Sequence, residues 1–319
     1  MMKHQTFRFG LLLERFSSRD ALVATARRAE AAGFSTLLVR DHFVAEPFGH
    51  QFAPFVTLAV VAEATRTLRV GTLVIDNDYR HPAVLAKEAA TLDLLSGGRF
   101  ELGLGAGWAQ ADYAQTGMTF DPARVRIDRL VEALTVVKAL FATPPATFSG
   151  HHYRLSGLDS FPKPTQRPHP PILVGAGGRR MLEIAAREAD VVAIMAAPIT
   201  SGAIGDDPRT RLQASFAERV GWVREAAADR FEWLELSLVA SLLPSDDRSQ
   251  TAATLARTRG WDTLSTPDVL AMPQFLIGTA AQMADDLCAR RESLGFSYIV
   301  IADRDLEAAL PLVERLAAT

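Results

Sequence analysis

Apolar runs of strand length alternate with segments of helical periodicity along nearly the whole chain. Such alternation predicts a mostly parallel sheet covered by helices. Eight runs are predicted as strands: Phe7–Leu13, Thr36–Val39, Leu68–Ile75, Arg99–Leu104, Pro171–Val174, Asp190–Met195, Glu235–Leu243 and Tyr298–Ala302. The predicted helices include Asp20–Ala32, Pro82–Leu95, Pro122–Phe141, Arg179–Glu188, Pro208–Ala228, Ala280–Leu294 and Leu306–Ala318.

The number of strands favours a closed barrel over an open doubly wound sheet. Open sheets usually have fewer strands, and those that bind dinucleotides carry a glycine-rich turn after the first strand. Here the first strand ends in residues 12–16, which contain no glycine. The 319 residues, 48% of them hydrophobic, suffice for one large core. We therefore expect a single-domain (β/α)8 TIM barrel spanning residues 1–319.

Two stretches interrupt the alternation, at residues 143–170 after the fourth strand and 244–278 after the seventh. The first is rich in proline, histidine and aromatic residues, and the second contains two short helical pieces around Gly260 and Trp261. Long insertions in barrels often serve as lids or binding loops, but some only add packing. The sequence leaves both interpretations open.

The charge balance and the cysteine count exclude several classes of protein. Net charge is −3 with 22% charged residues, so no basic excess points to nucleic acid or a membrane surface. The single cysteine, Cys288, excludes an intramolecular disulfide and a cysteine-cluster metal site. The acidic residues at strand ends are too scattered to indicate a metal site. Without an apolar signal segment or a run of roughly 20 apolar residues, we expect a cytoplasmic protein.

The active site of a barrel lies at the carboxyl ends of its strands. His42 follows the second predicted strand, beside Asp41, and an imidazole exchanges protons near neutral pH. His42 is therefore the candidate catalytic residue. The alternative is a histidine in a surface loop.

Glycines follow the fourth and fifth predicted strands. Gly103, Gly105 and Gly107 precede Trp108, and they either admit a flat ligand or ease a tight turn. Residues 175–178 lead into a helix that opens with two arginines, which indicates a phosphate site at the helix N-terminus. The alternative is a tight loop with arginines facing solvent.

Other catalytic motifs are absent from the sequence. We find no Gly-x-Ser-x-Gly elbow, no His-Glu-x-x-His, no P-loop lysine and no lysine at a strand end. A phosphorylated organic cofactor that carries the chemistry fits these observations best.

The chain resembles the luciferase-like monooxygenase superfamily and, within it, the deazaflavin-dependent oxidoreductases. The resemblance covers nearly the whole chain and is most specific at residues 92–108. The segments that carry it are residues 41–43, 69–74, 80–88, 92–108, 171–175 and 275–279.

The resemblance implies a hydride-transferring oxidoreductase that uses 8-hydroxy-5-deazaflavin (coenzyme F420). The alternative is an FMN-dependent monooxygenase that uses reduced flavin, supplied by a separate reductase, and O2. A third hypothesis is a barrel that binds its cofactor without turnover.

The resemblance also assigns roles to particular residues. It implies proton transfer by His42, a bulge with a non-prolyl cis peptide at Leu73–Val74 against the ring, and Trp108 beside ring and substrate. The catalytic residue we expect is His42. The cofactor-binding residues we expect are Asp41, Leu73, Val74, Asp76, Gly107, Trp108, Gly175, Ala176, Gly177, Gly178 and Arg179.

Departures from the family pattern narrow the range of expected substrates. In the deazaflavin-dependent sugar-phosphate dehydrogenases a glutamate stands at the position of Trp108 and an asparagine at that of Ala111. The lysine of their sugar-phosphate pocket is replaced by residues 195–198, Met-Ala-Ala-Pro. These departures argue against a phosphosugar and favour a small apolar substrate. The resemblance also implies a homodimer through the helices at 54–64 and 82–95.

Overall fold

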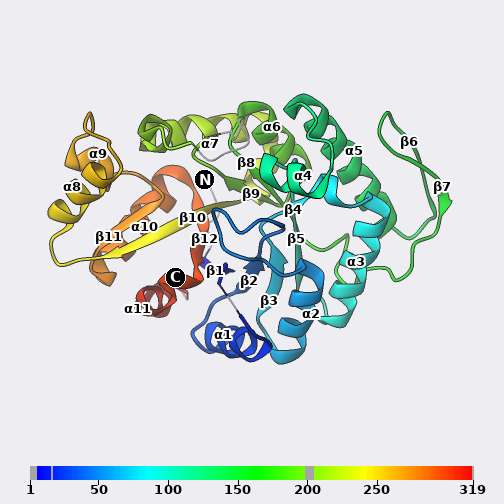
Figure 1. Cartoon of the computed structure of the whole chain (residues 1–319), viewed down its shortest axis with the longest axis horizontal. Coiled ribbons are helices and arrows are strands. Elements are labelled where there is room, and N and C mark those ends of the chain that lie inside the picture. The colour runs from blue at the N-terminus through cyan, green and yellow to red at the C-terminus, as the bar shows by residue number, and fades with distance from the viewer. Residues whose placement is uncertain (1–5, 16, 198–204, 318–319) are drawn as a thin grey trace.

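The computed structural model describes residues 6–15, 17–197 and 205–317. Within them eight parallel strands close into a barrel, which confirms the predicted fold (Figure 1). The pairing of β10 with β9 completes the ring. The barrel strands are β1 (Arg8–Leu13), β2 (Thr36–Val39), β3 (Arg69–Thr72), β5 (Phe100–Gly105), β8 (Ile172–Ala176), β9 (Val191–Ile194), β10 (Glu235–Pro244) and β12 (Phe296–Ala302).

Helices surround the barrel on its outside (Figure 1). They are α1 (Arg19–Ala31), α2 (Pro54–Ala64), α3 (Pro82–Leu95), α5 (Ala123–Phe141), α6 (Arg179–Glu188), α7 (Gln213–Ala227), α10 (Ala280–Leu294) and α11 (Leu306–Leu316). The helix predicted at 208–228 is divided into a short η2 (Pro208–Arg211), α7 and the first residue of η3 (Ala228–Trp233). The predicted end of the last helix, Ala318, lies outside the described residues.

Both insertions form structure of their own. Residues 143–170 contain an antiparallel hairpin of β6 (Ala146–Ser149) and β7 (Arg154–Leu158), which projects at the right of Figure 1. The second insertion contains the two expected short helices, α8 (Arg248–Thr258) and α9 (Thr266–Leu270). It also contains a strand that the hydrophobic pattern did not predict, β11 (Phe275–Gly278), which pairs with the last four residues of β10.

The amino end of the barrel is closed by ionic side chains. Arg8 bonds Glu101 and, at 2.6 Å, Glu235, while Arg69 reaches Glu101 at 2.5 Å. Above them an apolar layer fills the barrel interior, and it includes Leu12, Leu38, Leu173, Val191, Tyr298 and Val300. Since these two layers fill the lower barrel, a ligand has access only from the carboxyl end of the strands.

One barrel strand is interrupted on its way to that end. Beyond β3 the chain resumes its pairing with β5 as β4 (Ile75–Asp76). Gly71 pairs with Glu101 and Ile75 with Leu104, so four steps on this strand match three on β5. The extra residue makes a β-bulge. The Leu73–Val74 peptide inside it is cis, as expected from the resemblance.

Glycines of β5 make room for this bulge. A Cβ atom at Gly103 would lie 1.9 Å from the Thr72 carbonyl oxygen, and one at Gly105 would lie 2.7 Å from a methyl group of Val74. These two glycines therefore accommodate the neighbouring strand. The structure therefore gives a packing reason for Gly103 and Gly105, and the close approach of a ligand stays a prediction.

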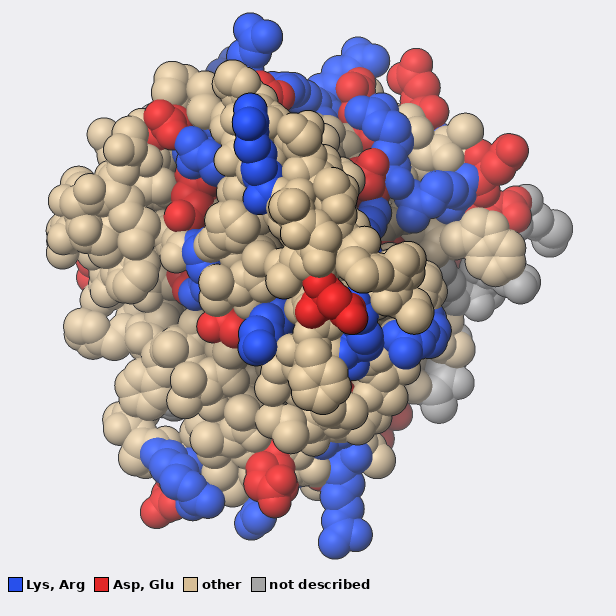
Figure 2. All heavy atoms as spheres, turned by 90° about the vertical axis from the view of Figure 1, so that its right-hand side faces the viewer, with Lys and Arg blue, Asp and Glu red and all other residues tan. Residues whose placement is uncertain are grey.

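The outer surface carries mixed charge. On the face that bears the β6–β7 hairpin, basic and acidic side chains are interspersed among uncharged ones (Figure 2). None of the helices in the described ranges combines the length and the apolar composition needed to cross a membrane.

We predict that Gly103→Ala destabilises the protein, because the added methyl group would overlap the Thr72 carbonyl. The free energy of unfolding, measured by urea titration, should fall by about 2–3 kcal/mol. Gly221→Ala is the matched control, since a Cβ there meets nothing within 4 Å in the middle of α7. That variant should gain up to about 1 kcal/mol. Equal stabilities for the two variants would contradict this account of the bulge.

Candidate active site

The carboxyl end of the barrel is open on the side of β10. Leu238 and Ala240 are each 2% exposed and pack toward the helices, whereas Val239 between them is 39% exposed. Because side chains alternate along a strand, Val239 faces the inside of the barrel. Met195, directly after β9, is also 39% exposed. The barrel interior is thus accessible and apolar at this level.

His42 follows β2 and is held by a carboxylate from a distant segment. Its Nδ1 lies 2.7 Å from Oδ2 of Asp112, which is completely buried. Asp112 belongs to α4 (Gln110–Thr116), a short helix after β5 that the sequence did not predict. Asp112 comes four residues after Trp108, on α4, and so lies beyond the residues that directly follow β5. It is the main functional residue that sequence reasoning missed.

Two aromatic rings border His42. The Trp108 ring lies edge-on to the imidazole at 5.4 Å between centroids, and the Phe48 ring lies at 5.5 Å. The guanidinium of Arg40 stacks on the other ring of this group, Phe48, at 3.7 Å, while it pairs with buried Glu14. The imidazole of His42 is therefore bordered mainly by aromatic rings, and the nearby guanidinium of Arg40 is paired with Glu14.

Asp41 and Asp76 form a second group of buried carboxylates. Arg80 pairs with Asp41 at 2.6 Å, and the Asp76 amide donates to the same carboxylate at 3.3 Å. The Tyr113 hydroxyl donates to Asp76 at 3.0 Å. Burial, reinforced by the charges of Asp78 and Asp41, raises the pKa of Asp76 to about 7. Asp76 therefore takes up a proton near neutral pH inside the folded protein.

Gly107 fits against this carboxylate group. It adopts the left-handed region at φ +75°, and a Cβ there would lie 2.1 Å from the Tyr113 hydroxyl. Its carbonyl accepts a hydrogen bond from buried Arg126. Glycine at this position is explained by protein packing alone, and a role toward the cofactor remains a prediction.

The loop from β8 into α6 holds the predicted phosphate residues. A Cβ at Gly175 would lie 3.5 Å from Val74, so this loop adjoins the bulge. Ala176 is buried, the Gly177 carbonyl accepts from Arg219 at 3.2 Å, and Gly178 is the N-cap of α6 without a side-chain cap.

The two arginines of that loop are engaged by carboxylates. Arg179, 58% exposed in its side chain, pairs with Glu183 at 2.8 Å, and Arg180 pairs with Asp128. This arrangement corresponds to the alternative of solvent-facing arginines. Any anion here would be held mainly by backbone amides.

The structure thus assembles most of the predicted site at one end of the barrel. His42, Asp41, Asp76 and Trp108 are linked through contacts with α4 and the residues around it, while Leu73–Val74 joins them to the β8–α6 loop. Cys288 lies on α10, outside this group. Across the described part of the chain, no group of three or more histidine, cysteine, aspartate or glutamate side chains is arranged to hold a metal ion.

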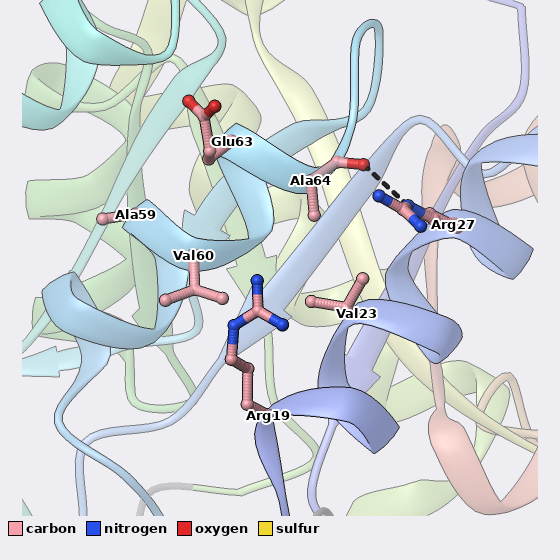
Figure 3. A pocket seen from close by; sticks show the side chains of 7 residues that line it. All are labelled: Arg19, Val23, Arg27, Ala59, Val60, Glu63 and Ala64. Carbon is pink, nitrogen blue, oxygen red and sulfur yellow. Dashed lines mark hydrogen bonds between the residues drawn. The ribbon is translucent and has the colours of Figure 1, made fainter.

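A separate hollow of about 490 Å³ lies on the outer wall between α1 and α2 (Figure 3). It is lined by Arg19, Val23, Arg27, Ala59, Val60, Glu63 and Ala64. Arg27 donates to the Ala64 carbonyl at 3.2 Å across it. It contains none of the predicted site residues.

Comparison with known proteins gives a consistent assignment. The sequence profile of the luciferase-like monooxygenase family matches residues 7–298. The F420-dependent glucose-6-phosphate dehydrogenase of Amycolatopsis mediterranei (strain U-32) is 30% identical over 300 residues, 92% of this chain and 84% of that protein. The F420-dependent hydroxymycolic acid dehydrogenase of Mycobacterium tuberculosis (strain ATCC 25618 / H37Rv) is 38% identical over 176 residues. That match spans 54% of this chain and about half, 48%, of the relative.

A solved structure shows the same fold. An F420-dependent secondary alcohol dehydrogenase, in complex with an F420-acetone adduct, superimposes with a TM-score of 0.75. The alignment covers 99% of this chain and 100% of that one at 19% identity.

We predict that Asp76 makes stability fall as pH rises. The folded protein keeps the Asp76 proton up to about pH 7, whereas the unfolded chain releases it near the ordinary aspartate pKa of 3.8. The unfolding free energy of wild type minus that of Asp76→Asn should therefore drop by roughly 2–4 kcal/mol between about pH 4 and pH 7.5. Urea titrations over this range measure it. Asp20→Asn, at a carboxylate 94% exposed, is the control and should give a flat difference. A flat or rising difference for Asp76→Asn would count against the assignment.

Proposed function

The chain belongs to the luciferase-like monooxygenase family, and from this premise we propose that it is an F420-dependent oxidoreductase. The observation that carries the proposal is His42, which is held by buried Asp112 and bordered by Trp108 at the open end of the barrel. The F420 dependence stated for the two relatives supports a deazaflavin over a flavin.

The residues at the barrel mouth fit such a cofactor. Leu73 and Val74 offer an apolar surface for a flat ring, and exposed Val239 and Met195 leave space inside the barrel wall. The amides of residues 175–179 at the N-terminus of α6 suit a phosphate group. In this proposal Asp41, Asp76 and Gly107 lie beside the ring.

The chain's own residues supply proton transfer and a dry site. The deazaflavin, when bound, accepts or donates the hydride. His42 exchanges the accompanying proton at Nε2, because Nδ1 is engaged by Asp112. Trp108 and Phe48 border the imidazole and limit access of water to it.

We propose a small apolar alcohol or carbonyl compound as the substrate. Exposed Val239 and Met195 are apolar, and Trp108 and Phe48 are aromatic. The resemblance also gives no lysine for a phosphosugar after the sixth predicted strand, where residues 195–198 read Met-Ala-Ala-Pro. In oxidation of an alcohol, His42 would take the O–H proton and the bound deazaflavin would supply the acceptor for the C–H hydride, so that a C=O bond is left. The names of two similar proteins, a hydroxymycolic acid dehydrogenase and a secondary alcohol dehydrogenase, support this class.

We also propose a homodimer formed through α2 and α3. These neighbouring helices carry apolar side chains that face solvent, namely Val56 (70% exposed), Val84 (51%), Leu94 (50%) and Leu95 (71%). Exposed apolar side chains on adjacent helices are typical of an interface.

Anaerobic titration with reduced F420 and with reduced FMN tests the cofactor. We expect F420 to bind at least about tenfold more tightly than FMN. Trp108 fluorescence should report binding, because the proposed ring lies beside this side chain. Oxygen uptake with FMN and an added flavin reductase is the control for the monooxygenase alternative. Tight binding of FMN alone, with oxygen consumed, would overturn the proposal.

His42→Ala separates an enzyme from a carrier. Loss of the proton-exchanging group should lower kcat by about 100-fold or more while cofactor binding persists. Unchanged turnover in this variant would favour a protein that only binds the cofactor.

Sedimentation analysis tests the dimer. Wild type should sediment with twice the mass of one chain, and Leu95→Lys should weaken association at least about tenfold because it places a charge in the interface. Ala253→Lys on α8, also exposed, should leave association unchanged. A monomeric wild type would refute this proposal.

A further inference from the structure

We propose that Asp112 is a positioning residue that fixes the tautomer of His42, so that Nδ1 always carries a hydrogen and Nε2 alone exchanges the proton. The catalytic consequence rests on the proposed function above. The tautomer itself is a property of this chain and can be measured without any cofactor.

Asp112 is saturated with hydrogen-bond donors. Its Oδ1 accepts from the amides of Phe43 at 2.9 Å and Val44 at 2.7 Å. Its Oδ2 accepts from the Tyr79 hydroxyl at 3.2 Å and faces His42 Nδ1 at 2.7 Å. A carboxylate accepts hydrogen bonds at both of its oxygens, and three of these four contacts are supplied by donors. The carboxylate therefore requires a donor at its fourth contact, and that donor is the imidazole.

The donors around Asp112 determine where the shared hydrogen lies. Three of its contacts are donated by Phe43, Val44 and Tyr79, so the hydrogen of the fourth contact belongs to Nδ1 of His42. Nε2 of the neutral ring is then left without a hydrogen.

The remaining nitrogen is left for the reaction. Within the described part of the chain, no group forms a hydrogen bond with Nε2 of His42, whose side chain is 13% exposed. The Phe48 and Trp108 rings lie against the imidazole and oppose its rotation. A ring that cannot rotate and has one nitrogen engaged presents a single atom to the substrate.

One segment supplies two of the groups that constrain the imidazole. Trp108 leads into α4, and Asp112 lies on it. The next residue, Tyr113, is fully buried and anchors the helix by donating to Asp76 at 3.0 Å. Helix α4 is thereby held against β4 through Tyr113, and it holds His42 in place through Asp112.

Nitrogen NMR on the cofactor-free protein with labelled histidine tests the tautomer. Wild type should show a pyrrole-type signal for Nδ1 and a pyridine-type signal for Nε2, with the assignment made by the signal lost in His42→Gln. In Asp112→Asn the amide oxygen must face the two backbone N–H groups, so its NH2 faces Nδ1. The tautomer should therefore invert, with the hydrogen on Nε2.

Kinetics with F420 and the alcohol or carbonyl substrate test the consequence. Asp112→Asn should lower kcat by about 100-fold or more and change KM by less than about threefold, because binding groups are untouched. Tyr79→Phe removes one of four donors and should keep the wild-type tautomer. Asp20→Asn, on the exposed first turn of α1, should match wild type in both measurements.

The outcomes separate this inference from the proposed function. A wild-type spectrum with the hydrogen on Nε2 overturns the inference, and so does an inverted tautomer in Asp112→Asn with unchanged kcat. Should that variant fail to fold, the spectra of wild type and Tyr79→Phe still decide the tautomer. If F420 does not bind while wild type shows the predicted tautomer, the proposed cofactor is wrong and the role of Asp112 in fixing the ring stands.

Discussion

The approach of the Thr72–Val74 segment to β5 sets the geometry of the candidate site. An extra residue on the β3–β4 strand enters the space that side chains at positions 103 and 105 would fill. Val74 then reaches across to Gly175, so three neighbouring barrel strands meet at one point. Because this contact is made by backbone and small groups, it tolerates little change in either partner.

Beyond the bulge, two buried aspartates have opposite surroundings. Asp112 receives donors at every position, including two backbone amides. Asp76 is crowded by other carboxylates, which together with burial raises its pKa. Carboxyl groups placed in contrasting environments are a common arrangement where protons must be held in one place and moved in another. Helix α4 connects the two, since Asp112 and Tyr113 are consecutive residues.

Sequence alone predicted the barrel and its eight strands, because alternating patterns are set locally by each segment. The resemblance added the cis bulge. The sequence did not predict Asp112, since its role depends on a hydrogen bond to a residue 70 positions away. It also missed β11, a strand of four residues that lies within the second insertion and pairs with the end of β10. For Arg179 and Arg180 the residue type favoured phosphate, and only the structure reveals the carboxylates that occupy them.

Strand β10 performs two tasks along its length. Its first three residues close the ring with β9, and its last four pair with β11 of the insertion. Between these ladders, Val239 lacks a partner on β9. The pairing of β10 with β9 therefore ends before Val239, and the insertion that contains α8, α9 and β11 is attached to the second half of β10. The length of this insertion can therefore change without altering the register of the closed ring, because the two pairings of β10 involve different residues.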